Sequence, residues 1–330
     1  MNLKEEILKL KEKLDVTIVA HFYQRDEVFE LADITGDSLE LAKRAMLTES
    51  KNILFCGVGF MGESVKVLSP NKRVLMPKIA CCAMAKMIDA QYYDESIKIL
   101  NDAGISSDNI LPITYINSSA SVKAKVGEMG GMVCTSSNAY KIIEKGLKSG
   151  KKILFVPDRC LGQNFAKQMN LVSAVIGDGT SLSDADIICY NGFCSVHQLF
   201  SVDDIEFYRN KYEDILIAVH PECDPSICDK ADFVGSTSQL IKYITELPIE
   251  QKVAVGTEYN MVNRLRQKNT YILSSTKPEC PTMNETTLQD VYDSLKMLEQ
   301  EQSQPYLNEI LVDEDVAKWA NVALNRMLEL

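Results

Sequence analysis

Three cysteines are spaced along the sequence in a way that could hold an iron–sulfur cluster. Cys82, Cys194 and Cys280 each lie a few residues beyond a short apolar run that is typical of a β-strand. Three thiolates can bind three irons of a 4Fe-4S cluster, whereas electron-transfer clusters usually have four cysteine ligands. The fourth iron then has a free position and can act as a Lewis acid on a substrate oxygen. The pattern therefore indicates substrate chemistry.

The sequence has only three histidines, and each lies in or beside a loop that follows a predicted strand. His21 follows the first predicted strand, His197 comes three residues after Cys194, and His220 comes two residues before Glu222. Neutral imidazoles can orient or protonate a substrate, and a neighbouring carboxylate can serve as a general acid or base. We therefore expect the three histidines and Glu222 to act in catalysis or in substrate binding.

Serine and threonine residues stand at three places where a strand leads into a helix, in the segments 35–43, 134–139 and 235–240. Free backbone N–H groups at a helix start, together with hydroxyl groups, suit a carboxylate or a phosphate. Each segment alone is a common helix cap. Their repetition predicts an anionic substrate, although the chain itself has a formal net charge of −11.

The elements that must position these residues follow a regular order. Short β-branched runs alternate with helical patterns, which predicts an α/β protein with parallel sheets. Three times a strand, a helix, a second strand and a cysteine-bearing loop follow one another. Because functional loops follow the carboxyl ends of parallel strands, we expect three similar Rossmann-like αβα units in a pseudo-threefold arrangement around a central cavity. The expected parts are residues 1–95, 96–208 and 209–290, and a C-terminal helical tail, residues 291–330, that packs on the body.

Hydrophobic periodicity gives the individual elements. Strands are predicted at residues 16–20, 53–56, 74–76, 111–115, 132–134, 153–156, 187–190, 215–219, 233–235, 253–255 and 271–273. Helices are predicted at residues 38–46, 139–147, 239–243, 261–267, 288–299 and 315–328.

Composition excludes several classes of protein. The chain has no basic patch of the kind that binds nucleic acid or an anionic membrane, and no apolar stretch near the ~20 residues of a membrane span. With no signal-peptide core, a cytoplasmic protein is expected. There is no C-x2-C pair for a local zinc site, and Cys56, Cys134 and Cys189 are expected to be buried apolar residues. The segment 57–62 matches G-x-G-x-x-G, but the next strand leads to Lys78 where a dinucleotide site needs an acid.

The ordered motifs of the chain closely resemble those of the quinolinate synthases. The motifs are AHFYQ, TGDSLELAK, GVGFMGESVKVLSP, ACCAMA, TYINSSA, CTSSNA, VPDRCLG, GFCSVH, VHPECD, ADFVGSTSQL, VGTE and CPTMN. The resemblance runs in one order from about residue 16 to residue 290, and VHPE and GSTSQL are its most specific blocks.

This resemblance implies a three-unit α/β enzyme with a central 4Fe-4S cluster. It implies the condensation of iminosuccinate with dihydroxyacetone phosphate, with loss of phosphate and two waters, to give quinolinate for NAD biosynthesis. The implied partners are these small anionic substrates and, transiently, the enzyme that produces iminosuccinate.

The resemblance also assigns residues to roles. The cluster cysteines fall on Cys82, Cys194 and Cys280, because the family's A-G-C pattern corresponds to Ala80-Cys81-Cys82 here. Substrate contacts fall on His21, Ser38, Tyr115, Asn117, Ser136, His220, Glu222 and Thr237. The predicted catalytic residues are Glu222, Tyr23, His21 and His197.

Three alternatives stay open from the sequence. One is a different 4Fe-4S hydro-lyase that acts on a small hydroxy acid through the same free iron. A second is a non-catalytic iron–sulfur redox sensor, which would need a fourth protein ligand. A third, weaker one is a mononuclear zinc site formed by cysteine and histidine.

Overall fold

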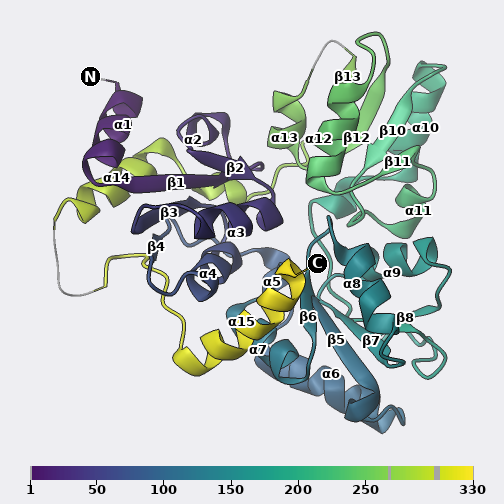
Figure 1. Cartoon of the computed structure of the whole chain (residues 1–330). Coiled ribbons are helices and arrows are strands. Elements are labelled where there is room, and N and C mark those ends of the chain that lie inside the picture. Colours follow the sequence, from purple (N-terminus) through teal and green to yellow (C-terminus); the bar gives the residue numbers. More distant parts are fainter. Residues whose placement is uncertain (1, 267–268, 301–304, 330) are drawn as a thin grey trace.

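The frame of the molecule consists of three separate β-sheets. The computed structural model describes residues 2–266, 269–300 and 305–329. Figure 1 shows the sheets and their helices around a common centre, the first in purple, the second in blue and teal, and the third in green. Among the described residues, every pairing between named strands is parallel. The predicted α/β fold of three similar units is confirmed.

The three sheets share one strand order, in which the first strand of a unit lies between the second and the third. The first sheet contains β2 (Ile34–Gly36), β1 (Val16–His21), β3 (Asn52–Cys56) and β4 (Arg73–Leu75) in this order. The second contains β6 (Met132–Cys134), β5 (Ile110–Tyr115), β7 (Lys152–Val156), β9 (Ile187–Cys189) and, added at the edge, β8 (Ser173–Val175). The third contains β11 (Phe233–Val234), β10 (Leu216–Val219), β12 (Val253–Gly256) and β13 (Thr270–Ile272).

Helices connect these strands and bury them. All six residues of β1 and all six of β5 are buried, as expected for parallel strands with both faces covered. The first unit contains α1 (Leu3–Lys13), α2 (Asp26–Phe29), α3 (Ser38–Met46), α4 (Gly59–Leu68) and α5 (Ala83–Lys86). The second contains α6 (Ala90–Asp102), α7 (Ala120–Glu128), α8 (Ala139–Leu147) and α9 (Arg159–Gln168), with short 3-10 turns η1 (Ser107–Asn109) and η2 (His197–Leu199). The third contains α10 (Val202–Lys211), α11 (Pro225–Cys228), α12 (Thr237–Glu246), α13 (Tyr259–Arg264) and η3 (Met283–Glu285).

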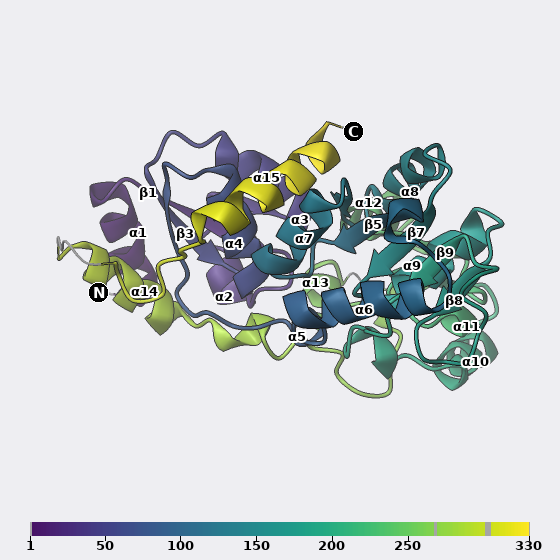
Figure 2. The ribbon, with the colours of Figure 1, turned by 90° about the horizontal axis from the view of Figure 1, so that it is seen from below.

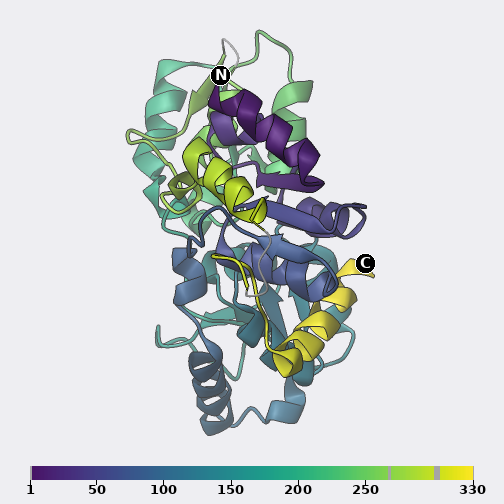
Figure 3. The same ribbon diagram turned by 90° about the vertical axis from the view of Figure 1, so that its left-hand side faces the viewer.

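Two helices follow the third unit and return to the first two. Helix α14 (Leu288–Leu298) packs on α1, where Leu295 and Ile7 belong to one fully buried apolar cluster. Figure 3 shows the two helices, yellow-green and purple, together on the outer side of the first unit. Of the predicted tail, residues 301–304 and 330 lie outside the described residues.

Helix α15 (Glu314–Leu328) joins the first unit to the second, because it packs on both α4 and α7. Figure 2 shows it in yellow across these helices. The approach to α7 is close enough to require glycine, since a Cβ on Gly127 would lie 2.1 Å from the carbonyl oxygen of Trp319. The C-terminal segment thus fixes the first two units relative to each other.

The structure adds two strands that the sequence analysis missed, β2 and β8, and each has only three residues. The predicted helix 261–267 is α13, and residue 267 lies outside the described residues. Cys56, Cys134 and Cys189 are fully buried at the ends of β3, β6 and β9, as expected. No helix within the described part of the chain has the length and apolar character that crossing a bilayer requires. The sheets lie within the predicted unit ranges, whose boundaries stay predictions.

Candidate active site

One cavity lies at the carboxyl ends of the strands and is lined by residues of all three units. Every residue that the sequence analysis selected lines it. These are His21, Tyr23, Ser38, Cys82, Tyr115, Asn117, Ser136, Cys194, His197, His220, Glu222, Thr237 and Cys280. The structure therefore brings the whole candidate set together, while the role of each residue stays a prediction.

The cavity-lining residues repeat with the strand order of the sheets. At the end of the first strand of each unit, two lining residues are separated by one position: His21 and Tyr23, Tyr115 and Asn117, His220 and Glu222. After the second strand comes a hydroxyl residue: Ser38, Ser136 or Thr237. After β4, β9 and β13, which correspond to one another, comes a cysteine: Cys82, Cys194 or Cys280. The parallel topology thus collects residues that are far apart in sequence at one edge.

The three cysteines form a cluster of thiols on the cavity wall. Burial is the main cause that raises the pKa of all three thiols, that of Cys82 to about 12. Charge repulsion from Cys280 also raises the pKa of Cys82, and repulsion from Cys82 and Cys280 raises that of Cys194. Cys81 is exposed and does not line the cavity. A metal-free site therefore holds protonated thiols, and metal binding would have to displace their protons.

A second group of metal-binding side chains overlaps this cluster. Within the described residues, Cys194, His197 and Glu222 offer ligand atoms that all lie within 4.8 Å of one another. Such a set could hold a single ion, so the zinc alternative needs a direct metal analysis.

Glu222 is the electrostatic centre of the cavity. Its Oε1 accepts a hydrogen bond of 2.5 Å from the hydroxyl of Tyr115, and its Oε2 lies 3.0 Å from Nδ1 of His197. Burial alone would raise the pKa of Glu222, but the neighbouring His197 and His220 and the hydrogen bonds lower it to about 2. The side chain is only 4% exposed, so a charged carboxylate is held away from bulk water at neutral pH.

His21 and His220 occupy matching positions and carry matching hydrogen bonds. Nδ1 of His21 accepts from the backbone N–H of Tyr23 at 3.1 Å, and Nδ1 of His220 accepts from that of Glu222 at 3.3 Å. Burial lowers the pKa of His21 to about 4 and that of His220 to about 3. Both rings are therefore neutral at pH 7, and because Nδ1 is an acceptor, the proton must be on Nε2. Each ring can donate this proton to a substrate oxygen.

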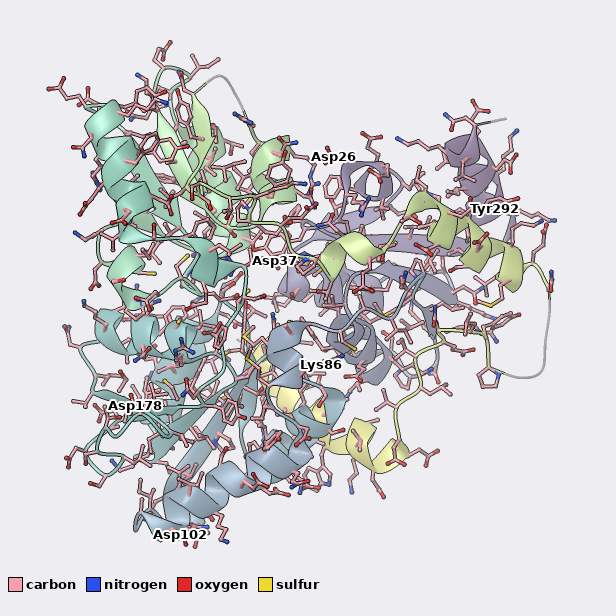
Figure 4. The ribbon with its side chains drawn as sticks, turned by 180° about the vertical axis from the view of Figure 1, so that it is seen from behind. Asp26, Asp37, Lys86, Asp102, Asp178 and Tyr292 are labelled. Carbon is pink, nitrogen blue, oxygen red and sulfur yellow. The ribbon has the colours of Figure 1, made fainter. Side chains whose placement is uncertain are left out.

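Asp37 also lines the cavity and was recognised from sequence only as a helix cap. Its Oδ1 accepts from the backbone N–H groups of Leu39 and Glu40 at the start of α3. Its Oδ2 accepts from the hydroxyls of Ser137, at 3.1 Å, and Ser238, at 2.5 Å. Figure 4 shows Asp37 between the three units, at the centre of the molecule. Its carboxylate links one residue of the second unit and one of the third to the first.

Thr257 is a second residue that the sequence analysis did not select. It directly follows β12 and is fully buried. Its hydroxyl lies within hydrogen-bonding distance of Tyr23 and of His197. The only sequence signal was its place in the VGTE motif, and a threonine after a strand is common.

Lys123 is a third residue that the sequence analysis did not select, and it supports the loop that carries Asn117. Its ammonium group is buried on α7 and donates to the carbonyl oxygens of Ile116, at 2.8 Å, and Ser118. Burial lowers the pKa of Lys123 to about 7. The two carbonyl bonds hold the backbone on either side of Asn117 against the cavity.

Comparisons with known proteins give one consistent result. A family model described as Quinolinate synthetase A protein matches residues 5–329. The chain is 55% identical over 335 residues to the quinolinate synthase of Helicobacter pylori strain HPAG1, which covers 100% of this chain and 98% of that protein. It is 39% identical over 350 residues to the quinolinate synthase of Acidobacterium capsulatum, and this alignment covers 100% of the chain and 93% of that protein. It is 39% identical over 343 residues to the quinolinate synthase of Streptomyces coelicolor, and this alignment covers 97% of the chain and 86% of that protein.

Proposed function

Because the chain is an enzyme of the quinolinate synthase family, we propose that it condenses iminosuccinate with dihydroxyacetone phosphate to form quinolinate in NAD biosynthesis. The reaction releases phosphate and two waters. The observation that carries this proposal is the cavity itself, in which each unit contributes a cysteine and polar residues from the same strand positions. Both substrates are anions, which fits the hydroxyl groups and neutral imidazoles of the lining.

Cys82, Cys194 and Cys280 are the proposed holders of a 4Fe-4S cluster. The donor set fits this group, because three half-buried thiols line one cavity and no fourth cysteine lines it among the described residues. Bound there, the cluster would supply a Lewis acid for a substrate oxygen through an iron without a protein ligand.

His21, His220 and the hydroxyl residues bind the substrates. The Nε2–H of a neutral imidazole can donate to a carboxylate or phosphate oxygen without adding a charge, and that of His220 already faces Ser136 at 3.3 Å. Ser38 and Thr237 lie in the first turns of α3 and α12, where backbone N–H groups favour an anion. Tyr115 and Asn117 position the carbon chain of the substrate from the second unit.

Glu222 is the general base and acid. As a carboxylate at neutral pH it can accept a proton from a substrate carbon or nitrogen, and the resulting acid can return it to a leaving oxygen during dehydration. His197, at 3.0 Å, orients this carboxylate. Tyr23 lines the same cavity and is the second acid–base group.

The test is to purify the full chain without oxygen, count iron and sulfide, and assay quinolinate formation from the two substrates. About four irons and four sulfides per chain with product formation support the proposal. One zinc and no sulfide would favour the mononuclear site, and a cluster with a fourth protein ligand would favour a sensor. A loaded cluster that dehydrates a hydroxy acid but makes no quinolinate would favour the hydro-lyase.

A Glu222→Gln variant tests the acid–base assignment. We expect its turnover to fall by about 10²–10⁴-fold, the usual contribution of a positioned acid–base group, with an unchanged iron content. Full turnover with an intact cluster would remove Glu222 from this role.

A further inference from the structure

Thr257 contacts one catalytic candidate from each of the other two units. Its Oγ1 lies 3.2 Å from the hydroxyl of Tyr23, in the first unit, and 3.1 Å from Nε2 of His197, in the second. Thr257 is 0% exposed and does not line the cavity. Thr257 therefore contacts Tyr23 and His197 on the side away from the cavity and has no direct access to a substrate.

The position of Thr257 breaks the threefold pattern of the molecule. Strands β3, β7 and β12 occupy the same place in the three sheets, and the residues that directly follow them are Gly57, Pro157 and Thr257. Only the third of these has a hydroxyl group. The extra hydroxyl stands where the side chains of Tyr23 and His197 meet, so packing of the repeated fold does not account for it.

Thr257 is the hydrogen-bond partner of the His197 ring among the described residues. Nδ1 of this ring lies 3.0 Å from Oε2 of Glu222 but is buried without a hydrogen bond, whereas Nε2 lies 3.1 Å from Oγ1 of Thr257. Because a threonine hydroxyl has a single proton, Thr257 can donate to either Tyr23 or His197 and must accept from the other if both contacts are hydrogen bonds. The two contacts therefore depend on each other.

A second threonine contacts the same phenol, because Oγ1 of Thr237 lies 3.0 Å from the hydroxyl of Tyr23. The phenol is therefore held between Thr237 and Thr257, and the series of contacts runs from Thr237 through Tyr23 and Thr257 to His197.

We propose that Thr257 is a positioning residue that orients the phenol of Tyr23 and the ring of His197 in the active site. This inference rests on the acid–base roles proposed above for Tyr23 and Glu222. Thr257 acts through Tyr23 and His197 and touches no substrate.

The experiment compares Thr257→Val, which has nearly the same shape but no hydroxyl, with Thr257→Ser, which keeps the hydroxyl. We expect Thr257→Val to lower kcat by about tenfold to a hundredfold and to leave KM within about twofold, since the loss affects acid–base chemistry more than binding. Thr257→Ser should restore most of kcat. The control is Thr286→Val, because Thr286 is also fully buried but its hydroxyl has no partner among the described residues.

A second readout does not depend on turnover. The chain has three histidines, so nitrogen NMR of the imidazole rings can be assigned with single histidine variants. In the full chain, His21 and His220 should have their proton on Nε2, because Nδ1 of each accepts a backbone hydrogen bond. Thr257→Val should shift the Nε2 signal of His197, and Thr286→Val should leave all three rings unchanged.

A double variant shows whether Thr257 acts through Tyr23. If it does, the loss of kcat in Tyr23→Phe combined with Thr257→Val should be clearly smaller than the product of the two single losses. Wild-type kcat in Thr257→Val, a Thr257→Ser variant as slow as Thr257→Val, or an unchanged Nε2 signal of His197 in Thr257→Val would overturn the inference. The first of these results together with a slow Glu222→Gln would refute only the role of Thr257, whereas a fully active Glu222→Gln would refute the proposed acid–base chemistry.

Discussion

Two side chains, those of Thr257 and Asp37, each form hydrogen bonds to residues of both other units, and the two sites differ in charge and exposure. At one, Thr257 of the third unit contacts Tyr23 and His197, and a neutral hydroxyl with 0% exposure connects them. At the other, the carboxylate of Asp37, 8% exposed, accepts from Ser137 and Ser238. We call these the Thr257 junction and the Asp37 junction.

The difference follows from what a hydroxyl and a carboxylate can do. A threonine hydroxyl has one proton, so its contacts have a direction, and a change on one side is transmitted to the other. A carboxylate accepts on both oxygens, and Asp37 uses them for four donors, two of which are backbone N–H groups of its own helix. The Thr257 junction is therefore suited to orienting reactive groups, and the Asp37 junction to holding units together.

The largest expected effect is at the Thr257 junction, when the imidazole of His197 is removed. His197→Phe keeps an aromatic ring but leaves Oε2 of Glu222 without its 3.0 Å partner. Burial, the largest influence on the pKa of Glu222, is then less opposed, so this pKa should rise from about 2. We expect kcat to fall by about a hundredfold or more at neutral pH.

The pH dependence of His197→Phe shows in which direction the pKa of Glu222 has moved. Wild-type Glu222 is ionised well below neutral pH, so it should produce no acid limb in the range above about pH 4. With the pKa raised, the carboxylate becomes protonated as pH falls through the new value, and the rate should fall with it. The measurement is the pH–rate profile of His197→Phe at equal iron content. An acid limb that does not move would contradict the role of His197.

The next largest effect concerns stability at the Asp37 junction. Asp37→Ala removes a helix cap, worth about 1 kcal/mol, and two hydrogen bonds to a charged group, each worth about 1.5–3 kcal/mol before relaxation. The matched control is Asp89→Ala, because Asp89 caps α6 through the N–H of Tyr92 alone. Urea unfolding should show a loss of roughly 2–4 kcal/mol for Asp37→Ala and about 1 kcal/mol for Asp89→Ala. Equal losses would mean that the links between units contribute nothing.

Both junctions show where sequence analysis stops. The cysteines, histidines and hydroxyl residues follow predicted strands, and because parallel strands end at one edge, their meeting could be predicted from topology. Asp37 and Thr257 act through partners in other units. A TGDS segment predicts a cap on α3, and nothing in its pattern indicates that the second carboxylate oxygen binds Ser137 and Ser238.

The missed strands have a similar cause. Strands β2 and β8 have three residues each, lie at sheet edges and contain no long β-branched run. Their pairing with β1 and β9 comes from the arrangement of longer strands.

The choice of Cys82 over Cys81 came from the family resemblance, since spacing alone allows either residue. In the structure, burial separates the two thiols, because only Cys81 is exposed.

The smallest expected effect tests whether the two junctions also differ in their control of access to the cavity. Ser137 lines the cavity, and its bond to Asp37 ties this wall of the second unit to the first. In Ser137→Ala or Ser238→Ala, the loss of about 1.5 kcal/mol, the lower value for a hydrogen bond to a charged group, should make local opening about tenfold more frequent. Alkylation of Cys82, Cys194 and Cys280 in the metal-free chain measures this opening, and the exposed Cys81 is the internal control for reagent and pH.

Thr257→Val, which removes the hydroxyl, should leave these rates unchanged, because the Thr257 junction lies behind the wall and does not border the cavity. The comparison predicts faster alkylation of the three cavity thiols only in the two serine variants, with an unchanged rate at Cys81. Equal acceleration in Thr257→Val would show that both junctions control opening, and the division between an orienting and a holding junction would then be wrong. Unchanged rates in all variants would mean that reagents reach the thiols without any separation of the units at Asp37.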